Sequence, residues 1–265
     1  MVLAVGLALI LKATLVQAFS IPSGSMEKTL HGCDGCQGDR VLVNKLVYDV
    51  RGIHRGEIVV FNGSKDWAKD GGEGGPPPHR GTVGSALHHV GVFFGVASDD
   101  KDYIKRVIGL PGDRVMCCSP RGNVVVTPPH GKPVELNEPY VYNPTPDNNA
   151  QFCAAAGAVT QSDLAKKACV PGAEGVLVPK GRLFVMGDHR DDSSDSRYHF
   201  DDGVHGTIAE SDVIGRAFVV VWPPKRWKVL GVPATFTSAA ATPPVLGFLG
   251  AVPLTVLRRR RKQRA

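Results

Sequence analysis

Two residues of this chain have side chains that together could carry out nucleophilic chemistry. Ser25 lies in the turn-forming segment SIPSGSM, and Lys105 follows 80 residues later within the segment DYIKRVIGLPGD. A lysine in water is charged at neutral pH and cannot accept a proton, but apolar neighbours destabilise the ammonium and favour the free amine. A free amine can take the proton of a serine hydroxyl. The pattern therefore predicts a Ser–Lys pair able to attack a carbonyl carbon.

Each half of this pair also has an ordinary structural interpretation. Ser-Gly-Ser sequences are common in turns without any catalytic role. Around Lys105, successive side chains alternate between two faces of the predicted strand, with Tyr103 and Lys105 on one face and Ile104 and Arg106 on the other. A solvent-exposed β-ribbon shows the same alternation, so the prediction depends on finding the two segments together.

Four segments in order resemble the motifs of the bacterial type I signal peptidases. They are SIPSGSMEKTL (20–30), RGEIVVF (55–61), DYIKRVIGLPGD (102–113) and GDHRDDSSDSR (187–197). The chain departs from the family pattern at Lys28, where proline is usual, and at His189, where asparagine is usual. Neither departure changes an atom proposed to react.

The resemblance implies specific roles in catalysis. Ser25 would be the nucleophile and Lys105 the general base. The Ser23 hydroxyl and the Ser25 backbone N–H would form the oxyanion hole, and Ser193 would orient the lysine amine. The implied enzyme is a membrane-bound serine endopeptidase that removes signal peptides from exported preproteins, and it uses no metal or organic cofactor.

The resemblance also implies supporting and substrate-binding residues. Asp195 and Arg197 would form an ion pair behind the site, with Ser196 beside them. Shallow apolar pockets would admit small side chains and select an Ala-X-Ala cleavage sequence. The residues predicted to line these pockets are Ile21, Pro22, Met26, Leu30, Tyr103 and Ile104.

Two other chemistries compete for the acidic segment. The spacing of Asp191, Ser193, Asp195 and Asp202 resembles a calcium-binding loop, although glycine is missing at the sixth position and glutamate at the twelfth. His189 could instead serve as the base of a Ser–His–Asp triad.

Composition predicts a mainly β, antiparallel catalytic domain over residues 22–230. The chain has 265 residues, 31 of them glycine and 20 proline, and its valine-rich runs are typical of strands joined by turns. Residues 63–100 contain a Gly/Pro run and three histidines, and we expect a mobile insertion there rather than a metal site.

The N-terminal residues 1–21 are apolar apart from Lys12 and Gln17, which predicts a membrane-spanning anchor. A cleavable leader is the alternative, since Ala18-Phe-Ser20 has the small-X-small spacing of a cleavage site. The absence of basic residues before the apolar run suggests that the native chain starts upstream of Met1.

Residues 234–257 predict a second span, with an Ala/Pro-rich tail as the alternative. The basic tail 258–265 contributes six positive charges, which equals the whole formal net charge of +6. That distribution disfavours a nucleic-acid partner and favours a lipid bilayer, with the tail in the cytoplasm and the catalytic domain on the extracytoplasmic side of a bacterial plasma membrane. Trp222 and Trp227 could enter the lipid surface.

Six cysteines in an oxidising compartment predict disulfides, and we expect Cys153 or Cys169 to reach the Cys117-Cys118 pair. Cys33 and Cys36 fit a short disulfide or free thiols better than half of a zinc site or a redox motif.

Two other functions remain open at this stage. A self-cleaving repressor-type protease shares the Ser–Lys chemistry but would carry a DNA-binding segment in place of the apolar one. A non-catalytic, membrane-tethered binding module of the same fold would have the same sequence pattern without activity.

Overall fold

The computed structural model describes residues 15–33, 36–63, 67, 102–119, 121–142, 175–199 and 204–239. The predicted mainly β, antiparallel fold is confirmed, because every strand pairing in these residues is antiparallel. The strands are β1 Val16–Ser20, β2 Arg40–Asn44, β3 Ile58–Asn62, β4 Asp102–Gly109, β5 Arg114–Cys117, β6 Val124–Thr127, β7 Val134–Glu135, β8 Val176–Leu177, β9 Arg182–Met186, β10 Ile208–Ala209, β11 Val213–Trp222 and β12 Lys228–Val229. The helices are η1 Gly24–Met26, α2 Val47–Val50, η2 Ser196–Tyr198, η3 Glu210–Asp212, η4 Pro224–Arg226 and α6 Ala234–Ala239.

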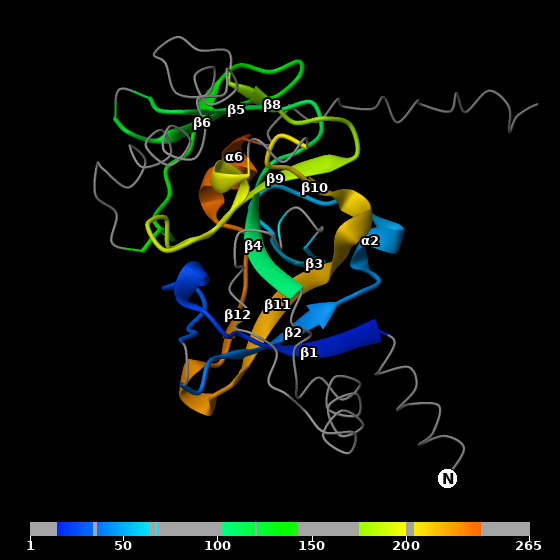
Figure 1. Cartoon of the computed structure of the whole chain (residues 1–265), viewed down its shortest axis with the longest axis vertical. Helices are drawn as coiled ribbons and strands as arrows, with labels where there is room; N and C mark the ends of the chain where they lie inside the picture. The colour runs from blue at the N-terminus through cyan, green and yellow to red at the C-terminus, as the bar shows by residue number, and fades with distance from the viewer. Residues whose placement is uncertain are drawn as a thin grey trace, which may run out of the picture.

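The larger sheet places the strand that carries Lys105 near its centre (Figure 1). Its order is β1-β2-β11-β3-β4-β9-β10, and β12 pairs with β11. Seven of the eight residues of β4 are buried, so this strand is covered on both faces. β4 is therefore not the solvent-exposed ribbon that the same alternation would also allow, because other parts of the protein cover both of its faces.

The smaller sheet, of order β7-β6-β5-β8, lies at the top of the molecule in Figure 1. Four of its valines pack with Ile108 of β4 and Phe184 of β9 in one apolar cluster: Val115, Val124, Val126 and Val176. Phe236 of α6 belongs to the same cluster and is 2% exposed. This cluster therefore joins the two sheets and the C-terminal helix.

The membrane predictions receive a partial correction. Residues 16–20 of the predicted anchor form β1. Each of these five residues has a partner in β2, from Val16 opposite Asn44 to Ser20 opposite Arg40. Residues 234–239 of the second predicted span form α6, which packs onto the folded core through Phe236. Within the described ranges, no helix has both the length and the apolar character needed to cross a membrane. Residues 1–14, 240–257 and the basic tail 258–265 lie outside the described residues.

The predicted insertion over residues 63–100 is described at Gly63 and Trp67. Trp67 is 1% exposed and packs edge-on against Phe61, with Tyr103 in the same cluster. At least this residue is part of the core rather than a mobile loop. The three histidines of the segment lie outside the described residues.

One disulfide agrees with the expectation, since Cys33 and Cys36 form a short bridge, and the other does not. Cys33 pairs with Cys36, and Cys117 pairs with its neighbour Cys118. The prediction that Cys153 or Cys169 reaches the Cys117-Cys118 pair is wrong, since the two adjacent sulfurs bond to each other and need no long loop to close. Cys153 and Cys169 lie outside the described residues.

Candidate active site

Ser25 stands in the middle of η1, a single tight turn that follows an extended segment. Ser23 before it has an extended backbone, with φ −126° and ψ 163°. The turn closes through the Glu27 backbone N–H, which donates to the Gly24 carbonyl at 2.9 Å. Met26 and Leu30 have no exposed surface and pack in the core beside β2 and β11, so they fix the turn in place.

Lys105 reaches the Ser25 hydroxyl from β4. Its Nζ lies 2.8 Å from Ser25 Oγ, and the exposed fractions of the two residues are 0% and 1%. Lys105 pairs across the sheet with Val59 of β3, which is also fully buried. The two residues singled out from the sequence are thus brought into contact in a largely dry environment.

Two groups lie close to the Ser25 hydroxyl and carbonyl. The Ser23 hydroxyl lies 3.4 Å from Ser25 Oγ. On the other side, the His189 backbone N–H donates to the Ser25 carbonyl oxygen at 3.0 Å. This bond ties the nucleophile turn to the acidic segment that follows β9.

Asp195 is the centre of a buried hydrogen-bond network in that segment. It accepts from Arg197 Nε at 2.7 Å and from Arg197 Nη2, the Gly187 N–H and the Ser193 hydroxyl, each at 2.8 Å. Burial by itself raises the pKa of Asp195, but the charge and hydrogen bonds of Arg197 and the hydrogen bond from the Gly187 N–H lower it by more, so the net shift is downward. Asp195 is therefore a fixed anion close to Lys105.

The remaining predicted members of the segment have defined contacts. Ser193 is 5% exposed, and its hydroxyl donates to Asp195. The Ser196 hydroxyl accepts from the Val185 backbone N–H at 2.9 Å, which fixes η2 against β9. These hydrogen bonds hold the acidic segment 187–197 in one fixed conformation against β9.

Two buried ion pairs near the site were not predicted. Arg106, next to Lys105 in β4, forms a bidentate pair with Asp188 at 2.8 and 2.6 Å, and the Thr29 hydroxyl donates to the same carboxylate at 2.5 Å. Arg190 pairs with Glu138 at 3.0 and 2.5 Å and donates through Nε to the Gly187 carbonyl at 2.9 Å. The position of Arg106 on the same strand face as Ile104 and Ile108 was a sequence signal for its burial, but nothing in the sequence marked Asp188 as its partner.

The competing interpretations of the acidic segment fit the geometry less well. The His189 ring lies 3.2 Å from the Gly24 carbonyl and 3.3 Å from Asp191, whereas the Ser25 hydroxyl faces Lys105. The Asp195 carboxylate is occupied by Arg197, as an ion pair rather than a calcium ligand. Asp202 lies outside the described residues.

The predicted pocket residues separate into two groups. Pro22 is exposed, and Ile21, Tyr103 and Ile104 keep 3%, 8% and 7% of their surface. Met26 and Leu30 are completely buried, so here they are packing residues rather than open pocket walls.

A β-rich domain with a buried serine hydroxyl against a lysine amine has the arrangement of a serine hydrolase that uses lysine in place of histidine. Comparison with known proteins agrees. The family model described as "Signal peptidase, peptidase S26" matches residues 1–222. The chain therefore belongs to the signal peptidase family, peptidase S26, and is a signal peptidase hydrolase.

Individual relatives support this assignment. The "Probable signal peptidase I" of Mycobacterium leprae is 38% identical over 252 residues, which cover 87% of this chain and 76% of the relative. The "Signal peptidase I" of Mycobacterium tuberculosis is 36% identical over 86% of this chain and 72% of the relative. That of Pseudomonas fluorescens is 31% identical over 82% and 69%. A solved signal peptidase I from Enterococcus faecalis V583 is 19% identical with a TM-score of 0.29 and covers 63% of this chain and 97% of that chain; the assignment does not depend on it.

Proposed function

We propose that this protein is a membrane-bound serine endopeptidase that removes N-terminal signal peptides from exported preproteins and cleaves after small residues by a Ser–Lys dyad. The observation that carries the proposal is the 2.8 Å contact between Lys105 Nζ and Ser25 Oγ in a buried setting. Signal-peptide cleavage itself is inferred from the family, and the residue roles are inferred from this contact and its surroundings.

In the proposed mechanism, Lys105 as a free amine takes the proton of Ser25 while Oγ attacks the scissile carbonyl carbon. The Ser23 hydroxyl and the Ser25 backbone N–H stabilise the resulting oxyanion. The protonated amine then gives its proton to the leaving nitrogen as the peptide bond breaks. A water molecule deprotonated by the same amine hydrolyses the acyl-enzyme and restores the serine.

The acidic segment keeps the lysine in position. The Ser193 hydroxyl donates to Asp195, and Arg197 Nε donates to the same carboxylate. From this fixed position, in the proposed mechanism, Ser193 orients the amine. Because most of the lone pairs of the Asp195 carboxylate already accept hydrogen bonds, this carboxylate does not form a simple ion pair with the lysine amine.

Substrate selection would depend on the apolar residues around the dyad. The small side chains of an Ala-X-Ala cleavage sequence would contact Ile21, Pro22, Tyr103 and Ile104. Met26 and Leu30 instead pack beneath the turn that carries Ser25, on its core side. An extended substrate adds its backbone beside the strand that carries Lys105.

Association with a lipid bilayer is supported by exposed apolar side chains at one end of the larger sheet. Trp222 is 43% exposed, Trp227 67% and Val229 80%, and Val229 pairs with Val219 of β11. Tryptophan favours the boundary between water and lipid. We place this end of the domain against the extracytoplasmic face of the plasma membrane.

The test uses the full chain in detergent with a preprotein substrate. Ser25→Ala and Lys105→Met should each abolish processing while thermal unfolding stays cooperative. Ser194→Ala is the matched control, because its hydroxyl contacts His199 at 3.3 Å and it should cleave normally. Near-normal processing by either of the first two variants would refute the dyad, and a wild-type protein without activity would favour the binding-module alternative.

A further inference from the structure

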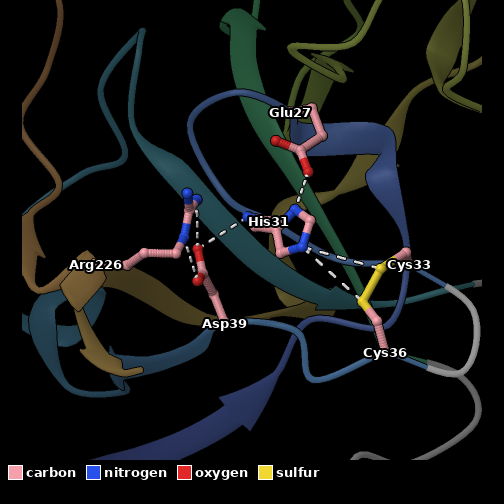
Figure 2. Close-up of a disulfide and its surroundings, with 6 residues drawn as sticks. All are labelled: Glu27, His31, Cys33, Cys36, Asp39 and Arg226. Atoms are coloured by element: carbon pink, nitrogen blue, oxygen red, sulfur yellow. Dashed lines mark hydrogen bonds and ion pairs between the residues drawn. A yellow bond between two sulfur atoms is a disulfide. The ribbon is translucent and has the colours of Figure 1, made fainter. Parts of the chain in front are cut away.

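A second group of reactive side chains follows the nucleophile turn and is not used by the proposed mechanism. His31, Cys33 and Cys36 bring one imidazole and two sulfurs within 4.8 Å of one another (Figure 2). His31 Nε2 lies 3.9 Å from Cys33 Sγ and 3.9 Å from Cys36 Sγ. Among the described residues, this is the group of histidine, cysteine and acidic side chains that lies close enough to hold one metal ion.

The distances are close to those of ligands on a single zinc ion. With Zn–S near 2.3 Å and Zn–N near 2.0 Å, two ligand atoms on a tetrahedral ion lie roughly 3.5 to 3.8 Å apart. The His31 nitrogen already lies near this separation from both sulfurs. The sulfurs are bonded to each other in the disulfide, so they must part before they can bind a metal.

The histidine is oriented as a metal ligand would be. Its other ring nitrogen, Nδ1, contacts the Glu27 carboxylate at 2.5 Å, which directs Nε2 at the sulfurs, as Figure 2 shows. Histidine ligands in zinc sites usually donate their second nitrogen to a carboxylate or carbonyl, which fixes the tautomer and increases ligand basicity.

The backbone that carries His31 is fixed independently of the disulfide. The His31 N–H donates to the Asp39 carboxylate at 2.8 Å, and the Asp39 N–H donates to the His31 carbonyl at 2.7 Å. Asp39 is held in turn by Arg226, whose Nε lies 2.7 Å from its carboxylate (Figure 2). Opening the disulfide should therefore leave the histidine where it is.

We infer that the dithiol form of this chain binds a soft divalent cation, Zn²⁺, through His31 Nε2, Cys33 Sγ and Cys36 Sγ. A thiol reductant supplies two electrons and two protons to the disulfide and itself becomes a disulfide, and metal binding then displaces the protons of the two cysteine thiols. Among the described residues, no fourth ligand atom joins these three. Oxidation and metal binding compete for the same two sulfurs, and Cys36 is exposed to both reagents. The inference does not depend on the proposed peptidase function.

The test measures metal binding by the full chain in detergent, reduced under nitrogen and freed of reductant. Titration with Co²⁺ should give thiolate charge-transfer and tetrahedral d–d absorption, and Zn²⁺ should displace it. The Cys33→Ser/Cys36→Ser variant should lose one equivalent of bound metal. The Cys117→Ser/Cys118→Ser variant should keep that equivalent, which separates this site from the other opened disulfide.

Two further variants test the roles of the other side chains. Glu27→Gln keeps all three ligands and should weaken metal binding about 10- to 100-fold. His31→Gln should change the Co²⁺ spectrum and weaken binding at least as much. Equal binding by the wild type and the Cys33→Ser/Cys36→Ser variant would overturn the inference, as would an unchanged spectrum in His31→Gln. If the wild-type protein bound Co²⁺ equally well before and after reduction, the inference would be overturned, and this comparison needs no variant that might fail to fold.

Discussion

At the scale of single residues, the role proposed for the Ser23 hydroxyl separates a catalytic turn from a purely structural one. It lies 3.4 Å from Ser25 Oγ, on a segment whose extended backbone lets the side chain face the same space. A donor there would stabilise charge that exists only during the reaction. It would contribute little to binding of the uncleaved substrate.

We therefore expect Ser23→Ala to lower kcat about 100- to 1,000-fold with little change in KM, as is typical when one oxyanion-hole donor is lost. Steady-state kinetics on a peptide with an Ala-X-Ala sequence would measure both constants, with Ser194→Ala as the control. A wild-type kcat in Ser23→Ala would exclude this hydroxyl from the oxyanion hole.

The sequence predicted the reacting pair better than its surroundings. Ser25 and Lys105 lie in short segments whose residue types were informative together, and the two atoms are indeed in contact. The ion pair between Arg106 and Asp188 joins residues 82 positions apart, and no local pattern specifies such a partner. The strand Val16–Ser20 was missed because an apolar run with one polar residue fits the end of a membrane helix as well as a buried strand.

At the scale of elements, the junction between β9 and the acidic segment sets the position of Ser25, the proposed nucleophile. Gly187 follows the last residue of β9, donates to Asp195 and accepts from Arg190. A Cβ atom at this position would lie 2.5 Å from the Ser25 carbonyl oxygen and would also collide with Ser193. Glycine is required here because the backbone of one element touches the nucleophile turn of another.

Gly187→Ala should therefore displace Ser25 and Ser193 and reduce kcat/KM by about 100-fold or more, since displacements of about 1 Å have that effect on well-oriented reactants. The matched control is Gly52→Ala, where an added Cβ meets no atom within 4 Å. Peptide cleavage and circular dichroism should be measured on both variants. Full activity in a folded Gly187→Ala protein would mean that the junction can shift without moving the nucleophile.

At the scale of the whole molecule, the chain beyond β12 completes the core that joins the two sheets. Phe236 of α6 is 2% exposed and packs with residues of β4, β5, β6 and β9, and its ring lies close to Gly56 before β3 and near Tyr140. A segment predicted to leave the domain for the membrane thus first fills an internal position. The smaller sheet is attached to the catalytic sheet partly through this side chain.

Phe236→Ala should accordingly lower the free energy of unfolding by about 3 to 5 kcal/mol, because it removes a large buried side chain and leaves a cavity. Phe236→Leu should cost less, since it keeps most of the apolar volume, and Trp227→Ala, at a residue 67% exposed, should change stability little. Urea denaturation of the three variants in detergent would measure these differences. If Phe236→Ala were as stable as the wild type, α6 would not be docked on the core, and the smaller sheet would be attached through its packing against Ile108 and Phe184 without a contribution from Phe236.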